Sequence, residues 1–517
     1  MWVPKYVRDA KKGVDSPIPT QEVSNEEFIP RPQNEKQRQV EDLIGTCGEE
    51  NAKKLGMQRR DFMRTSMGMA TAFLAMNAVH GDQIDVDPVE ALEPEASAEK
   101  FPKGEYFIID DQGHYSSNFE RGIPGPGGMG MGNLRGMPFM REAGLDSAVT
   151  AEGTSFHNFI KEMFFDSETS MLVLAGLEDY EKQRDEDGNV LQDWERSTLG
   201  MASWNMSRRK KDINAMAGSQ RVLSQANCAP NHYWDKQRNR PDYPALYEQM
   251  EREVNLYEAD SWKWYCHTDP AKSGTGYQLD DEWAAAFYEY SRKLGQKIFC
   301  IHKGFASMSR TMGGLANPKD VEKAALENPD LTFVIYHSGL KAIPGIPSAS
   351  SAEIRKSMDF DPATGDFEWH NVLMDIKRRN PQIDNVYCEL GSSFGLLALL
   401  DPILCQHFMG KNIKYFGADH VVWGTDCIWW GSPQWMIDYM KRFQISDELC
   451  EKFGYAKITK EDKAKIFGEN AARIWGIDLE EKRKALPADT IERFKASYEM
   501  AGGQRSNAAY GWVRAEA

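Results

Sequence analysis

The chain has 517 residues, of which 41% are hydrophobic and 11% aromatic, so it has ample material for a large packed core and is not a disordered protein. It carries 62 Lys and Arg against 78 Asp and Glu, a net charge of −16, which argues against a nucleic-acid-binding protein that relies on a basic surface. Its 8 cysteines are widely spaced without a CxxC pair, so the sequence predicts neither a thiolate zinc site nor a disulfide framework. No apolar run is long enough to predict a transmembrane span.

The first hundred residues divide into three segments by composition. Residues 1–56 are polar and rich in proline, which predicts a peripheral arm. In residues 57–81, Arg59 and Arg60 precede a weakly hydrophobic stretch, which resembles a twin-arginine export signal and implies the twin-arginine translocase as a partner and a periplasmic location. The alternative is a Met-rich helix packed on a cytoplasmic protein. Residues 82–100 are acidic and predict a solvated linker.

From residue 101 onward, short apolar runs alternate with longer stretches of helical spacing, which is typical of βα units. About eight alternations favour a closed α/β barrel, the (β/α)8 or TIM barrel, over an open doubly wound sheet. We therefore expect a barrel over residues 101–477, with an N-terminal extension and a C-terminal tail at 478–517. The strand candidates are 106–110, 171–175, 221–223, 261–265, 298–302, 333–337, 386–390 and 421–426.

Two helices are predicted with particular signals. Residues 281–294 carry Trp283, Phe287 and Tyr290 at the spacing of one helix face. Thr459 with Asp462 three residues later has the pattern of a capping box, which predicts a helix that begins there and ends at Gly468.

Polar residues end several of the predicted strands. His302, His337 and Asp426 each close an apolar run, and Gln112 and His114 follow the first strand at the spacing that turns both side chains the same way. In a barrel the carboxyl ends of all strands meet at one rim. Imidazole and carboxylate groups bind Zn²⁺ or a similar divalent ion, so the sequence predicts a metal site at that rim.

These residues, with the sequence GENAARIWGI at 468–477, resemble the amidohydrolase superfamily, specifically its amidohydrolase-related branch, which includes the aminocarboxymuconate semialdehyde decarboxylase-like enzymes. The resemblance implies that Gln112, His114, His302 and Asp426 hold one divalent ion, zinc or else manganese. It also implies that Asp426 and His337 act in catalysis. The family has a His or Glu where this chain has Gln112. Three consequences stay open: Gln112 binds the metal through its carbonyl oxygen, the metal rests on His114, His302 and Asp426 alone, or metal affinity is lost.

Other features have a functional and a structural interpretation. Lys263 is a candidate carbamylated lysine, a substrate contact or a salt-bridge partner, and Glu389 is a candidate substrate contact or a buried structural group. Residues 122–136 contain seven glycines and predict either a mobile lid or a surface loop. Trp429, Trp430 and Trp435 follow Asp426 and suit an apolar or aromatic substrate wall, or else core packing. We interpret the other histidines as structural: His157, His232, His267, His370, His407 and His420.

The leading functional hypothesis is metal-dependent hydrolysis of a small organic molecule, in which Asp426 accepts a proton and His337 steadies the developing oxyanion. The second is nonoxidative decarboxylation by the same residues. The third is a noncatalytic binding protein in which Gln112 marks a disabled metal site. The C-terminal tail is a candidate contact for a homodimer.

Overall fold

The computed structural model describes residues 2–25, 30–115, 156–176, 202–269, 273–305, 311–341, 351–503 and 511–515. The glycine-rich stretch 122–136 lies outside these ranges, so its predicted role as a lid or loop stays a prediction.

The centre of the molecule is a parallel sheet of eight strands that closes into a barrel. Neighbouring strands follow the chain order β2, β3, β4, β7, β8, β9, β12 and β13. The barrel closes where Gly113 in β2 pairs in parallel with Cys427, just beyond β13. The predicted TIM barrel is confirmed. The strand bounds are β2 Ile109–Gly113, β3 Met171–Leu174, β4 Val222–Ala226, β7 Ser261–Trp264, β8 Ile298–His302, β9 Thr332–Tyr336, β12 Val386–Glu389 and β13 Val421–Val422.

Side chains alternate along the barrel strands between the surrounding helices and the barrel interior, as the two-residue period of a strand requires. In β7, Trp262 and Trp264 pack outward with the helices, whereas Lys263 between them lies over the ring of Tyr336 from β9. In β12, Val386 and Cys388 belong to the same outer core, whereas Tyr387 between them belongs to a separate cluster with Val422 and Tyr336. The outer face is therefore apolar, and the interior holds polar groups near the rim.

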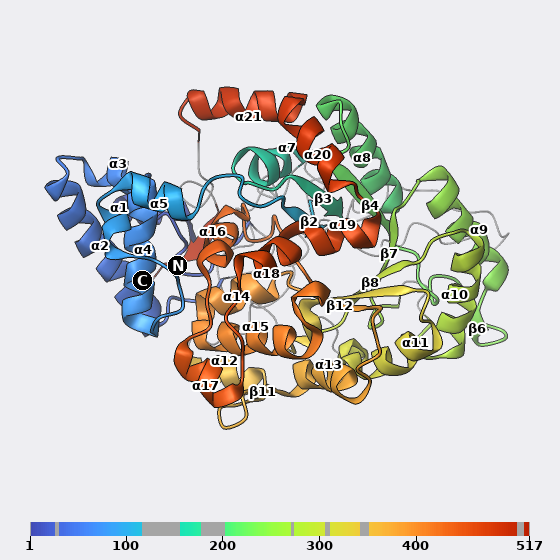
Figure 1. Ribbon diagram of the computed structural model, residues 1–517. Coiled ribbons are helices and arrows are strands. Elements are labelled where there is room, and N and C mark those ends of the chain that lie inside the picture. The colour runs from blue at the N-terminus through green and yellow to red at the C-terminus, as the bar shows by residue number, and fades with distance from the viewer. Residues whose placement is uncertain are drawn as a thin grey trace.

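Helices surround the barrel and cover the outer face of its strands (Figure 1). The predicted helix at 281–294 is α10, which is capped by Asp281 and buries Phe287 against Trp262 and Trp264. The helices between and after the barrel strands are α7 Phe156–Ile160, α8 Ser203–Ala217, α9 Tyr243–Glu251, α10 Glu282–Lys293, α11 Val321–Glu327, α12 Ser351–Ser357, α13 Glu368–Arg379, α14 Ser393–Leu400, α15 Pro402–Phe416, α16 Gln434–Arg442, α17 Asp447–Phe453, α18 Lys460–Ala464 and α19 Asn470–Trp475.

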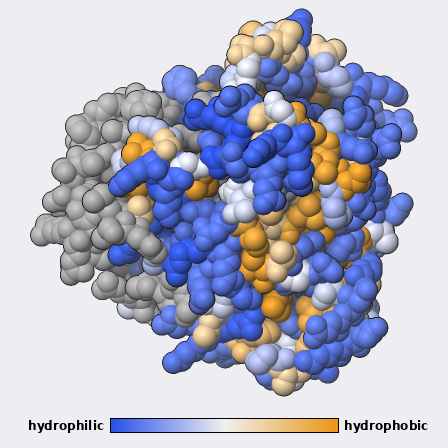
Figure 2. Space-filling model, turned by 90° about the vertical axis from the view of Figure 1, so that its left-hand side faces the viewer, coloured by the Kyte–Doolittle hydropathy of each residue, from blue (hydrophilic) through white to orange (hydrophobic). Residues whose placement is uncertain are grey.

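The N-terminal residues form a helical layer on one side of the barrel (Figure 1). Its central helix, α4, packs against α2 and places Phe73 edge-on to Tyr439 of α16. The predicted acidic linker at 82–100 contains two short helices. Figure 2 views the molecule from this side and shows a mainly hydrophilic face that is crossed by an apolar band. The helices are α1 Lys5–Lys12, α2 Glu35–Lys54, α3 Arg59–Met63, α4 Ser66–His80, η1 Pro88–Ala91 and α5 Pro94–Lys100.

The segment that resembles an export signal forms α3 and α4. Arg59 and Arg60 both contact Asp15, at 3.0 and 3.4 Å. The hydrophobic part is the buried face of α4, where Phe73 is fully buried. In the described residues no helix combines the length and the apolar character needed to cross a membrane. The export signal and the periplasmic location stay predictions.

The two chain ends meet. Strand β1 (Trp2–Pro4) pairs antiparallel with β14 (Trp512–Arg514). In the tail, α20 (Leu479–Ala485) and α21 (Thr490–Met500) lie over the barrel, where Asp489 binds the buried Arg221 at 2.6 Å. The tail is therefore tied to this chain's own barrel, and a homodimer stays a prediction.

The capping box at Thr459 and Asp462 is confirmed, but the helix does not end at Gly468. The chain continues through a wide helical turn, Lys465–Glu469, into α19, which ends at Gly476 in the left-handed conformation. A Cβ at position 468 would lie 2.0 Å from the carbonyl oxygen of Phe107. Glycine is therefore present because the helix touches the chain leading into β2, not because the helix stops.

This close approach predicts that Gly468→Ala lowers the free energy of unfolding by about 1 to 3 kcal/mol, since an added methyl group must push helix and strand apart. The matched control is Gly45→Ala in α2, where nothing lies within 4 Å of the new Cβ. That substitution should raise stability by about 0.5 to 1 kcal/mol. Urea unfolding of both variants checks the difference, and equal effects would contradict the proposed contact.

Candidate active site at the barrel rim

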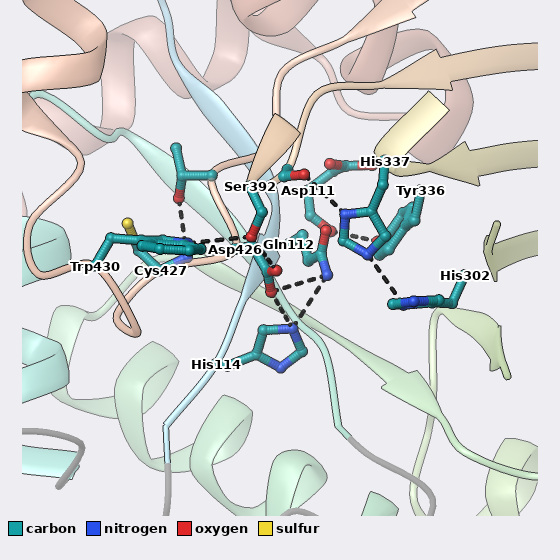
Figure 3. Close-up of polar contacts among 12 residues, drawn as sticks. Asp111, Gln112, His114, His302, Tyr336, His337, Ser392, Asp426, Cys427 and Trp430 are labelled. Atoms are coloured by element: carbon teal, nitrogen blue, oxygen red, sulfur yellow. Dashed lines mark hydrogen bonds and ion pairs between the residues drawn. The ribbon is translucent and has the colours of Figure 1, made fainter. Parts of the chain in front are cut away.

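Three predicted site residues meet where β2 pairs with the segment after β13. The Nε2 atom of His114 lies 2.9 Å from Oδ1 of Asp426, and Nε2 of Gln112 lies 3.0 Å from the same oxygen. The two nitrogens are 3.2 Å apart. Gln112 and His114 therefore turn the same way, and together with Asp426 they form a triangle of polar atoms (Figure 3).

Backbone pairing positions these side chains. The Asp426 N–H donates to the Gln112 carbonyl at 2.9 Å, and the His114 N–H donates to the Cys427 carbonyl at 2.6 Å. These bonds join residues more than three hundred positions apart in the chain. The register of barrel closure thus determines which side chains share the rim.

His302 and His337 form a second group beside the triangle (Figure 3). Nδ1 of His337 lies 2.8 Å from the Gly391 carbonyl, and because a carbonyl only accepts, this nitrogen carries the hydrogen. The Nε2 of His337 then accepts from Nδ1 of His302 at 3.0 Å. This arrangement leaves a lone pair on Nε2 of His302, which is buried and has no hydrogen-bond partner among the described residues.

Both of these histidines are held neutral. Burial lowers the pKa of His337 to about 4. Burial and the neighbouring His337 lower the pKa of His302 well below its ordinary value. Neutral imidazole is the form that binds a metal, so the chain from Gly391 through His337 presents His302 as a ready ligand.

Asp426 is held as an anion. Burial alone would raise its pKa, but the hydrogen bond and charge of His114, with His337 and the Ser392 hydroxyl, hold the pKa well below its ordinary value. Ser392 donates to Oδ2 of Asp426 and accepts from Nε1 of Trp430 at 3.1 Å. The carboxylate is therefore fixed on both oxygens.

Backbone strain is concentrated at this rim. Five described non-glycine residues here have positive φ: Phe305 at 48°, His337 at 66°, Ser338 at 47°, Ser392 at 53° and Asp426 at 59°. Such conformations each cost about 1 to 3 kcal/mol and occur mainly at functional sites. The strain supports a functional role for the rim.

A group of buried ionisable residues lies below the rim. Glu389 accepts the backbone N–H groups of His337, at 2.9 Å, and of Gly391. Burial raises the pKa of Glu389 to about 8 and that of Asp110 to about 7. Burial also raises the pKa of Asp111, and Glu389 raises it further. Glu389 therefore fixes the backbone that carries His337.

Lys263 lies in the same interior. Its Nζ is 3.4 Å from the centre of the Tyr336 ring and makes no hydrogen bond to the described residues. Burial lowers its pKa to about 8. The salt bridge that the sequence allowed for Lys263 is not formed with any described residue.

Three features of the site were not assigned from the sequence. Ser392 and the Gly391 carbonyl follow β12 in the sequence ELGSS. Their position at a strand end was the only feature of the sequence that could have identified them as part of the site. His267, interpreted as structural, lies beyond the end of β7 with its ring 5.0 Å from that of His302. Of the three tryptophans named in the sequence analysis, Trp429 stacks on His114 at 5.4 Å and Trp430 donates to Ser392, so two of them lie at the site.

The donor atoms of the triangle are of types that bind a divalent ion, but the predicted ligands His114, His302 and Asp426 are not all brought together. No group of three or more His, Cys, Asp and Glu side chains placed to hold a metal occurs in the described part of the chain, so His302 is not grouped there with His114 and Asp426, and the third member of the triangle is Gln112. Its Oε1 is buried without a partner among those residues, and a half-turn of the amide would exchange oxygen for nitrogen at the triangle. The triangle edges of 2.9, 3.0 and 3.2 Å are close to the spacing of about 3 Å between adjacent ligands in an octahedral site with bonds of about 2.1 Å.

Comparison with known proteins gives one family and several structures. The amidohydrolase family model matches residues 238–477. Three similar structures are 2,6-dihydroxybenzoate decarboxylase from Rhizobium (15% identity, TM-score 0.40, covering 72% of this chain and 99% of that one), 5-carboxyvanillate decarboxylase from Sphingomonas paucimobilis (14%, 0.40, 72% and 100%) and 4-oxalomesaconate hydratase from Rhodopseudomonas palustris (14%, 0.37, 73% and 98%). No match was found among curated proteins.

The buried Glu389 makes a contribution to stability that should fall as pH rises. The folded protein keeps a proton on Glu389 up to about pH 8, whereas the ordinary pKa is 4.5, so unfolding releases that proton at intermediate pH. The contribution of Glu389 to the free energy of unfolding should therefore fall by roughly 1 kcal/mol per pH unit between pH 6 and 8, beside the contributions of other buried groups. Glu389→Gln should remove this contribution and change the pH slope of stability by that amount.

Urea unfolding at pH 6 and pH 8, with a chelator present, measures the effect. The matched control is Glu480→Gln, whose side chain is 89% exposed. The control should keep the wild-type slope. An unchanged slope in Glu389→Gln would show that this carboxyl is ionised in the folded protein.

Proposed function

Since the family match over residues 238–477 supports placing this chain in the amidohydrolase superfamily, we propose that it is a metal-dependent enzyme that hydrolyses a small organic substrate. The observations that support the proposal are the triangle of His114, Asp426 and the Gln112 amide, and the unpartnered Nε2 of His302 in the neighbouring histidine pair. Imidazole, carboxylate and amide oxygen are ligand types for zinc or manganese.

In this proposal His114, His302 and Asp426 hold the ion, and Gln112 completes the set through its carbonyl oxygen. A divalent ion supplies Lewis-acid polarisation of a substrate oxygen and favours ionisation of water. The amide is neutral, so it leaves more of the ion's positive charge uncompensated than a carboxylate would.

The side chains around the set have separate tasks. His337 uses both ring nitrogens, on Gly391 and His302, so we assign it to positioning His302. In this proposal the positioning role takes the place of the oxyanion-stabilising role that the hydrolysis hypothesis gave to His337, since its one N–H is used on the Gly391 carbonyl. Asp426 is anionic, which suits a ligand; its low pKa makes it a weak base while His114 contacts it, and its role as proton acceptor stays a prediction.

Substitution of the ligands tests the proposal. His302→Ala and Asp426→Ala should each remove stoichiometric metal and lower turnover by about 10³-fold or more, because the Lewis acid is lost. Elemental analysis measures the metal. A substrate panel scored for both hydrolysis products and carbon dioxide measures the reaction.

The matched controls are the exposed His157→Ala and Asp447→Ala, which should keep both metal and activity. Near-wild-type turnover in either ligand variant would remove the site. Carbon dioxide release in place of hydrolysis products would assign nonoxidative decarboxylation. A chain that holds no metal and gains no activity with Zn²⁺ or Mn²⁺ would be a noncatalytic protein.

Gln112→Met tests whether the amide is a ligand. Methionine keeps the side-chain length but removes the oxygen, so the affinity for Zn²⁺ should fall at least tenfold, roughly the loss seen when a supporting residue of a metal site is removed. Competition against a chelator measures it, with the exposed Gln237→Met as the control. An unchanged affinity would leave the metal on His114, His302 and Asp426 alone.

A further inference from the structure

The loop that follows Asp426 contacts the rim through its backbone and through one aromatic ring. The Cys427 carbonyl accepts the His114 N–H at 2.6 Å, and the Ile428 N–H donates to the His114 carbonyl at 3.1 Å. The Trp429 ring stacks on the His114 ring, with 5.4 Å between the centroids and 22° between the planes. The loop therefore contacts both the backbone and the ring of His114.

The next residue of the loop, Trp430, makes the contact with Asp426. Its indole N–H donates to Oγ of Ser392 at 3.1 Å, and Ser392 donates its hydroxyl hydrogen to Oδ2 of Asp426. Figure 3 shows Ser392 between Trp430 and Asp426. Residues 427–430 thus act on two members of the triangle, His114 directly and Asp426 through Ser392.

One residue of the N-terminal arm, Asn25, binds the carbonyl groups of this loop. Its backbone N–H donates to the Trp429 carbonyl at 3.0 Å, and its side-chain amide donates to the Ile428 carbonyl at 3.0 Å. The same amide donates to Oε2 of Glu162 at 3.1 Å. Asn25 and Glu162 are both buried, so water does not compete for these hydrogen bonds.

The arm is itself held by the C-terminal end of the chain. Ser24, directly before Asn25, exchanges two backbone hydrogen bonds with Trp512 of β14, at 2.9 and 2.8 Å. A Cβ at Gly511 would lie 2.3 Å from Cγ1 of Val23, so the two segments are in close contact. Since β14 also pairs with β1, both ends of the chain support the position of Asn25.

We infer that Asn25 is a positioning residue of the candidate active site, which holds residues 427–430 so that their side chains keep their contacts with His114 and Ser392. The inference rests on the proposed function only where it calls the rim an active site, because the contacts require neither metal nor turnover. Loss of the amide would leave a buried loop carbonyl and Glu162 each with one hydrogen bond fewer, so the loop would gain freedom to move. The N-terminal arm is thereby part of the structure that supports the rim.

Fluorine NMR of the full-length protein labelled with 5-fluorotryptophan, with a chelator present, tests the inference without metal. The resonances of Trp429 and Trp430 are assigned with Trp429→Phe and Trp430→Phe and are then followed in Asn25→Ala. Both should shift or broaden by more than one linewidth, because the amide no longer holds the Ile428 carbonyl. The resonance of Trp262, in the outer core beside β7, should not move.

The matched control is Asn34→Ala. Asn34 is also a buried asparagine of the arm, and its side chain caps α2 by accepting the Gln37 N–H at 2.9 Å. Its loss lowers stability through the end of a helix and not through the loop. This variant should leave the resonances of Trp429 and Trp430 within one linewidth of wild type, which separates a loss of position from a general loss of stability.

Asn25 is buried, so Asn25→Ser covers the case in which Asn25→Ala does not fold. Serine keeps a polar group but is too short to bridge the loop and Glu162. Unmoved resonances of Trp429 and Trp430 in a folded Asn25 variant, or equal shifts in Asn34→Ala, would overturn the inference. Absence of metal and turnover in the wild-type protein, with the expected shifts in the Asn25 variants, would instead overturn only the proposed function.

Discussion

The arrangement of the rim depends on one constraint, the register in which β2 pairs with residues 423–428 to close the barrel. Each hydrogen bond of this pairing contributes only about 1 kcal/mol, but together they determine which side chains meet. The Asp426 N–H on the Gln112 carbonyl places a carboxylate from the end of the barrel against an amide from its beginning. A slip of one residue would turn Gln112 and His114 to the opposite face and separate them from Asp426. The backbone pairing that closes the barrel therefore also brings the site residues together.

His302 and His337 are held in place by a series of buried polar contacts. Each contact in the series depends on the one before it. Glu389 accepts the N–H of His337, which stabilises that residue at a φ of 66° despite its strain. His337 in turn bonds the Gly391 carbonyl and orients His302. As a result, the neutral ring of His302 keeps its free lone pair pointing in one direction. The ring of an isolated histidine in water rotates and has no such fixed direction. The buried carboxyl therefore acts on the rim through backbone geometry, at a distance from any substrate.

The sequence predicted the barrel well because its strands follow a strong local pattern, and β8 at Ile298–His302 matches the expected range. It also identified Gln112, His114 and Asp426 as neighbours, since strand ends converge in a barrel. It did not predict that the helix passes through Gly468, because local sequence shows glycine as a stop and cannot show the Phe107 carbonyl beside it. Ser392 was missed for a similar reason: a serine after a strand has no pattern that reveals the carboxylate it will meet.

The segment that resembles an export signal follows an N-terminal arm that is itself packed on the barrel. Residues 16–25 lie upstream of Arg59 and Arg60, and they contact the loop after Asp426 through Asn25. Removal of everything up to residue 81 would take away the contacts of Asn25 with the loop after Asp426 and also α4, whose Phe73 packs on Tyr439. In the described fold the arm and α4 both pack on the barrel, so residues 57–81 contribute to the same structure as the rim.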